Sequence, residues 1–185
     1  MTSDIVHTLI FAHAGHGSAG GFIHGLQHPI SGLDHILAML AVGVWAAMLG
    51  RRAVWAIPTT FVLAMGLGGA IGMTGYAFPA IEPGIAVSVM MLGLLIAAVA
   101  KVPIWVAAVL VSAFAIFHGV AHGSEMPFAT SGVAYGAGFL ISASLLMLCG
   151  VGIGSLMNRL SLQVVFRSVG AAVCIAGGFL VAGLL

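Results

Sequence analysis

Long apolar segments alternate along this chain with short connections that hold proline, glycine or charge. The segments are close to the length of about 20 residues that a helix needs to cross a bilayer. They are too long and too continuously apolar for barrel strands, and a helix satisfies its own backbone groups in lipid. The pattern therefore predicts six membrane-spanning helices, at about 31–50, 53–76, 82–100, 103–123, 128–150 and 163–185.

Composition supports an all-α, polytopic membrane bundle. Of the 185 residues, 62% are hydrophobic and 5% are charged, so one small soluble core cannot bury the apolar surface. A net charge of +1 gives no basic field for nucleic acid, and the absence of a GxxxxGK[ST] loop argues against a nucleotide partner. Close helix packing is the simplest interpretation of the pairs Gly68/Gly72 and Gly132/Gly136.

Charged residues are divided between two faces of the predicted bundle. All five basic residues lie at the connections after spans one, three and five, and the positive-inside rule makes that face cytoplasmic. The four acids and eight histidines lie in segments assigned to the opposite face. Both termini are then expected outside, with a His-rich extracytoplasmic segment at 1–30 and a transporter domain at 31–185. The basic residues are Arg51, Arg52, Lys101, Arg159 and Arg167.

Two clusters of ligand-forming side chains occur on the predicted outer face. The first precedes or opens span one and the second lies on one face of span four, where spacings of three and four residues align side chains. If these spans are neighbours, the six side chains converge on a site that suits nickel, cobalt, zinc or copper, which ligand type alone does not distinguish. The six candidates are His28, Asp34, His35, His118, His122 and Glu125.

Two further candidates have a structural alternative. Met39 lies one turn after His35, but ten methionines are spread through the chain and packing explains it better than metal binding. Glu82 stands beside Pro83, where an acidic residue also stabilises the start of a helix. Both stay candidate metal ligands with these alternatives open.

Two stretches carry a family resemblance. Residues 28–46, HPISGLDHILAMLAVGVWA, resemble the signature of the HupE/UreJ family of bacterial nickel permeases, and residues 118–125, HGVAHGSE, resemble its second motif. Residues 13–17 and 21–26 look like that family's mature amino terminus, which adds His24 to the candidates. The resemblance implies an inner-membrane metal permease with a periplasmic N-terminus, no prosthetic cofactor and no enzymatic activity, serving hydrogenase or urease maturation.

The amino-terminal segment departs from the family pattern. Members usually begin with a cleavable leader, and Ala12-His13 looks like a cleavage point, yet residues 1–12 lack a basic start and a long apolar stretch. We interpret 1–12 as an atypical or replaced leader. Cleavage would free the amine of His13 to chelate metal with its own imidazole and His16. Without cleavage, the two histidines are solvated capture residues or incidental members of a tail.

The sequence thus favours a permease for a divalent transition metal, nickel first and cobalt second, with copper and zinc as further possibilities. One alternative is a zinc-dependent membrane hydrolase that uses the same His/Asp cluster to hold a metal-activated water. The segment 118–122 lacks the glutamate of HExxH, which argues against it. A bis-histidine haem protein is a second alternative, with little support from HxxxH.

No exit path for the ion is predicted, because the inner half of the bundle offers only sparse polar groups. These groups are Thr59, Thr60, Ser88, Ser112, Ser142 and Ser144.

Overall fold

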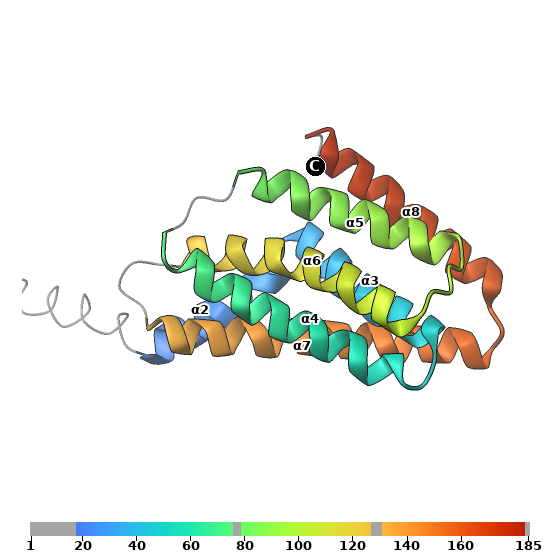
Figure 1. Ribbon diagram of the computed structural model, residues 1–185, viewed down its shortest axis with the longest axis horizontal. Coiled ribbons are helices and arrows are strands. Elements are labelled where there is room, and N and C mark those ends of the chain that lie inside the picture. Colours follow the sequence, from blue (N-terminus) through green and yellow to red (C-terminus); the bar gives the residue numbers. More distant parts are fainter. Residues whose placement is uncertain (1–17, 76–78, 127–130, 184–185) are drawn as a thin grey trace, which may run out of the picture.

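The computed structural model describes residues 18–75, 79–126 and 131–183, and within these ranges every element is a helix (Figure 1). The predicted all-α class is therefore confirmed. The helices are α2 (Ser18–Ser31), α3 (Leu33–Leu49), α4 (Ala53–Gly72), α5 (Ile81–Ala97), α6 (Ile104–Ser124), α7 (Gly132–Arg159) and α8 (Gln163–Val181).

Each of the six predicted spans corresponds to one helix from α3 to α8. Among the described residues, α4, α6, α7 and α8 are individually long and apolar enough to cross a membrane. Helix α5 is apolar but has only 17 residues, and α3 reaches the required length only together with α2. Length and composition thus support four crossings, or five with the bent pair, and a six-span topology stays a prediction.

Helix α2 is the main addition to the predicted layout. The sequence predicted no helix within the segment 1–30, but α2 forms there with Pro29 inside it, and only Gly32 separates α2 from α3, with a bend of 80°. The helix packs on α7 through glycines, since a Cβ on Gly25 would lie 2.0 Å from the Tyr135 carbonyl oxygen. Tertiary packing of this kind stabilises a short helix that local sequence leaves marginal.

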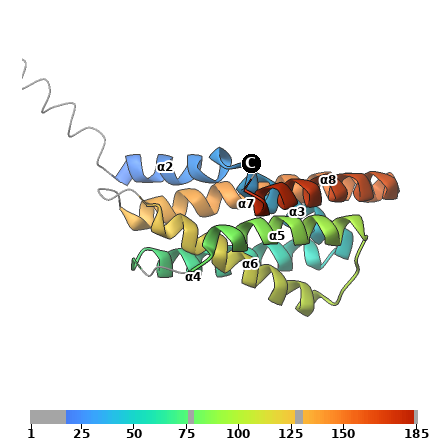
Figure 2. The ribbon, with the colours of Figure 1, turned by 90° about the horizontal axis from the view of Figure 1, so that it is seen from above.

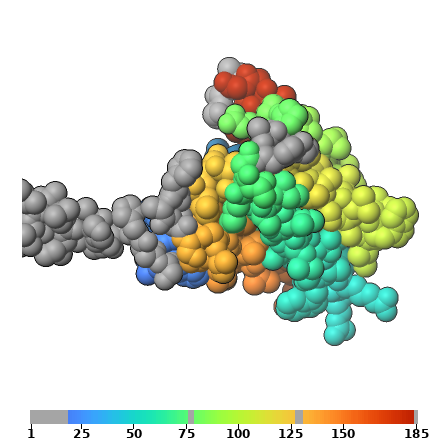
Figure 3. Space-filling model, turned by 60° about the vertical axis from the view of Figure 1, so that its left-hand side comes forward, coloured from blue at the N-terminus to red at the C-terminus, as the bar shows by residue number. Residues whose placement is uncertain are grey.

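The helices pair closely and enclose one apolar core. Helix α4 packs on α6, α3 and α2 pack on α7, and α5 runs beside α8 (Figures 1 and 2). The start of α5 meets the end of α8, at the top of the molecule in Figure 3. Large buried side chains fill the space between the pairs: Trp45, Phe61, Met65, Leu92, Phe139 and Met147.

Glycines set the spacing of α4 and α6. A Cβ on Gly68 would lie 2.6 Å from the Ile116 carbonyl oxygen, and one on Gly72 would lie 2.3 Å from that of Val120. The close packing predicted for this pair is confirmed. Gly132 and Gly136 differ, because their Cβ positions first meet the Met73 side chain at 3.2 and 3.8 Å and approach no backbone so closely.

The predicted separation of charge is seen in the fold. The connections α3–α4, α5–α6 and α7–α8 all lie at the right-hand end of Figure 1. Arg51, Arg52 and Lys101 occupy the first two connections, and Arg159 ends α7 beside the third. Four of the five basic residues thus gather at one end of the bundle, as the sequence predicts, whereas Arg167 lies within α8, four residues after its start, and not in the connection.

Candidate metal-binding site

Four histidines from three helices meet at the end of the bundle away from the basic connections. His28 comes from α2, His35 from α3, and His118 and His122 from successive turns of α6. The ring centroids of His35 and His122 are 4.5 Å apart, those of His28 and His122 are 4.8 Å apart, and those of His35 and His118 are 5.2 Å apart. The predicted convergence of the two sequence clusters is present.

Local structure explains why these rings meet. The bend of 80° at Gly32 turns α2 sharply away from the direction of α3 and brings the His28 and His35 rings, one on either side of the bend, to a centroid distance of 6.3 Å. A Cβ on Gly32 would lie 2.6 Å from the Asp34 carboxylate, so the bend has little room for a side chain. His118 and His122 are four residues apart on α6 and therefore lie on one helical face.

Several imidazole nitrogens of this cluster are buried without a hydrogen-bond partner among the described residues. They are His35 Nε2, His118 Nδ1 and both ring nitrogens of His122. His118 and His122 are completely buried. Because a buried polar atom left unpartnered costs about 1–3 kcal/mol, such a group of nitrogens is unfavourable unless something binds it. Neutral imidazole nitrogens are preferred ligands of nickel, cobalt, zinc and copper.

Two carboxylates orient the outer rings. The Glu125 Oε2 atom accepts a hydrogen bond of 2.9 Å from His28 Nε2, and Asp34 Oδ1 accepts one of 2.8 Å from His35 Nδ1. The bond from His28 holds the pKa of Glu125 below its usual range, against the opposing effect of burial. With its proton on Nδ1, His35 keeps the Nε2 lone pair free, which is the usual arrangement of a carboxylate behind a metal-binding histidine.

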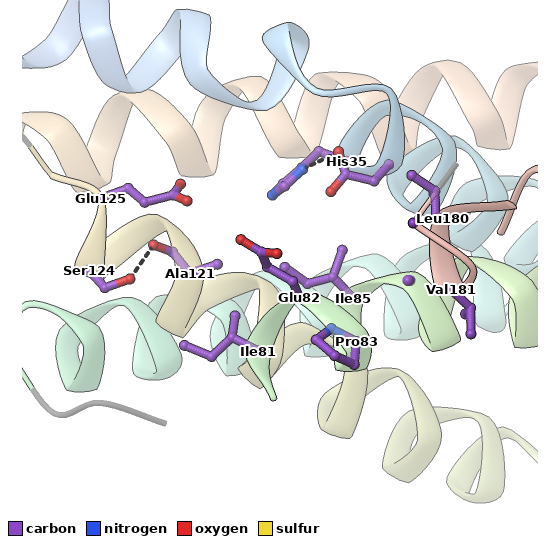
Figure 4. A pocket seen from close by; sticks show the side chains of 13 residues that line it. His35, Ile81, Glu82, Pro83, Ile85, Ala121, Ser124, Glu125, Leu180 and Val181 are labelled. Carbon is purple, nitrogen blue, oxygen red and sulfur yellow. Dashed lines mark hydrogen bonds and ion pairs between the residues drawn. The ribbon is translucent and has the colours of Figure 1, made fainter. Parts of the chain in front are cut away.

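A pocket of about 450 Å³ opens beside the histidines. Glu82 at the start of α5, Glu125 after α6 and His35 on α3 direct their side chains into one space (Figure 4). Asp34 also lines this pocket, so three carboxylates surround the approach to the rings. Such a concentration of negative charge attracts cations from the surrounding solution.

One set of three groups has the compactness of a metal site. Ligand atoms of His28, His122 and Glu125 all lie within 4.8 Å of one another. Their burial increases from exposed Glu125 through half-buried His28 to fully buried His122. The arrangement offers a cation a graded route from the solvent-facing carboxylate to the enclosed imidazoles.

The remaining sequence candidates lie elsewhere. Met39 is fully buried within the apolar core, in keeping with its packing role. His24 is exposed on α2, and no described hydrogen bond or ring contact joins it to the cluster. His13 and His16 lie outside the described residues, as does the proposed leader.

Two residues at the cluster were not predicted as site residues. Ser88 of α5, which the sequence placed among the polar groups of the inner half, has its Oγ 3.0 Å from His118 Nε2. Tyr135 of α7 is 1% exposed, its ring lies 6.1 Å from that of His28, and its hydroxyl has no partner among the described residues. Both lie outside the His-rich motifs, so only the fold brings them to the site.

Comparison with known proteins gives a consistent result. The family described as HupE / UreJ protein matches residues 2–180. Protein HupE of Rhizobium leguminosarum bv. viciae is 49% identical over 173 residues, which cover 93% of this chain and 91% of that protein. No solved structure matches the chain. The similarity extends over the last two helices, well beyond the two motifs that first suggested it.

Proposed function

Because the chain belongs to the HupE/UreJ family, a family of nickel and cobalt transport proteins, we propose that it takes up nickel, with cobalt second, across the bacterial inner membrane. One observation carries the proposal: the rings of His35, His118 and His122, which hold unpartnered nitrogens, gather beside a carboxylate-lined pocket. The ion is the cargo of this site and not a resident cofactor.

The donor groups suggest an order of binding. Asp34, Glu82 and Glu125 attract the hydrated ion into the pocket, where carboxylate oxygens replace some of its water. His35 Nε2 and one ring nitrogen of His122 then bind it in the enclosed part of the cluster. His28 joins them once its Nε2 atom releases Glu125 and the hydrogen on Nε2 has moved through solvent to Nδ1, which frees both this nitrogen and the Glu125 carboxylate to bind the ion.

Release and driving force follow from the chemistry of these donors. Imidazoles and carboxylates hold nickel less permanently than a closed thiolate cage, so the ion can leave toward the cytoplasm. Moving two charges down an inside-negative potential releases about 4.6 kcal/mol per 100 mV, twice the single-charge value. That free energy supports roughly a thousandfold higher concentration of the ion inside the cell than outside, so uptake needs no nucleotide hydrolysis.

Membrane orientation follows from the two ends of the bundle. We assign the basic connections to the cytoplasm by the positive-inside rule and the histidine cluster to the periplasmic side. In this topology α3 to α8 cross the membrane, and α2 with the residues before it belongs to the periplasmic side. Both termini are then periplasmic.

Uptake of radioactive nickel and cobalt by metal-starved cells tests the function. At equal membrane abundance, His35→Ala and His118→Ala should each abolish the uptake that the wild-type protein supports, and His24→Ala is the matched control that should keep it. An ionophore that collapses the membrane potential should stop wild-type uptake. Wild-type rates in the His35→Ala and His118→Ala double variant would overturn the site, and no uptake by folded wild-type protein would overturn nickel and cobalt as its cargo.

A further inference from the structure

We propose that Ser88 is a positioning residue that fixes the tautomer of His118 and so presents its Nδ1 atom to the metal. Ser88 lies on α5, thirty residues before His118 in the chain, and is completely buried. Its Oγ atom is 2.7 Å from the Ile85 carbonyl oxygen and 3.0 Å from His118 Nε2. The consequence for uptake rests on the proposed function, whereas the tautomer itself does not.

Counting hydrogens decides between the two tautomers. The Ile85 carbonyl can only accept, so the single hydroxyl hydrogen of Ser88 points to it and Oγ accepts the Nε2–H of His118. Both hydrogens then have acceptors. The other tautomer would bury an N–H at Nδ1, where the described residues offer no partner. Orphaned buried N–H groups are rare, so the structure favours hydrogen on Nε2 and a free lone pair on Nδ1.

This arrangement gives α5 two roles at different depths of one site. Glu82 in its first turn lines the mouth of the pocket, and Ser88 is six residues further along, about 9 Å deeper at 1.5 Å per residue. Without the Ser88 hydroxyl, the His118 ring loses its only described hydrogen bond. The proton can then occupy Nδ1, which blocks that atom as a ligand.

Nitrogen-15 NMR of histidine-labelled, metal-free protein tests the tautomer directly. His118 is assigned from the signals that disappear in His118→Ala. We expect a protonated Nε2 and an unprotonated Nδ1 in the wild type, and a mixture of tautomers in Ser88→Ala. Protonation of Nδ1 in the wild type, or an unchanged tautomer in Ser88→Ala, would overturn the proposal whether or not the protein transports metal.

The nickel concentration that gives half-maximal uptake tests the consequence. Loss of a hydrogen bond behind a metal ligand typically weakens binding 10–100-fold, so Ser88→Ala should raise this concentration by about tenfold or more. Ser88→Thr keeps the hydroxyl and should stay closer to the wild type. Ser144→Ala is the matched control, because the Ser144 hydroxyl donates to the Leu140 carbonyl in the same way without a histidine partner.

The two failures can be told apart. If wild-type uptake requires His118 and Ser88→Ala has the wild-type nickel dependence at equal membrane abundance, the role of Ser88 is wrong while the proposed function stands. If wild-type uptake does not require His118, the proposed function fails, and the NMR measurement still decides the tautomer.

Discussion

His122 distinguishes a metal site from polar contacts that merely hold helices together. Both of its ring nitrogens lack partners among the described residues, and its ring stacks on Phe139 with centroids 5.2 Å apart. We predict that His122→Leu leaves thermal stability unchanged or raises it, because it removes a buried polar group that makes no hydrogen bond. Nickel uptake by this variant should be lost. Thermal unfolding of the purified protein and cellular uptake measure the two effects.

His24→Leu is the control for that experiment, since His24 is exposed on α2 and lies outside the cluster. It should change neither stability nor uptake. A structural role for His122 predicts the opposite pattern for His122→Leu, with lower stability and residual uptake. That pattern would remove His122 from the proposed ligands.

At the scale of a helix, a glycine next to a histidine of the cluster determines how closely α6 approaches α4. Gly119 follows His118 and packs on the α4 backbone, where an added Cβ would lie 2.1 Å from the Met65 carbonyl oxygen. Because Cβ atoms essentially never approach closer than 3.0 Å, Gly119→Ala must push α6 away from α4. We predict a lower yield of folded protein and loss of nickel uptake in whatever folds, measured by membrane abundance and accumulation.

Gly152→Ala provides the comparison on α7. No atom lies within 4 Å of its added Cβ, and alanine favours a helix over glycine by about 1 kcal/mol. Its abundance and uptake should therefore equal or exceed those of the wild type. If Gly119→Ala behaved like Gly152→Ala, the tight contact between α4 and α6 would not be needed to place the histidines.

The elements also show how far the sequence determines this site. Apolar run length predicted α3 to α8, and motif spacing identified all four clustered histidines, because each signal is local. Helix α2 was missed because it is glycine-rich and is stabilised by packing on α7, which the local sequence does not show. The positions of Ser88 and Tyr135 beside the histidines depend on how α5 and α7 pack against the site, which hydropathy does not encode.

For the molecule as a whole, the bundle has two chemically different ends. The basic connections lie at one end, and the carboxylate-lined pocket with the histidine cluster lies toward the other. Imidazole must be neutral to bind a metal ion, and carboxylates attract the ion only from the compartment they face. The end that faces the periplasm therefore decides whether the histidine cluster captures metal from outside the cell.

Single-cysteine labelling tests that orientation. After replacement of Cys149 and Cys174 by serine, Thr74→Cys places an exposed thiol after α4, on the end opposite the basic connections, and Gln163→Cys places one at the start of α8. A membrane-impermeant maleimide should label Thr74→Cys in intact spheroplasts and Gln163→Cys only after lysis, because the basic end is retained in the cytoplasm. Nickel uptake by each variant checks that it is folded. The reverse labelling pattern in active variants would place the carboxylates inside the cell, and the assignment of the histidine cluster to the periplasmic side would be wrong.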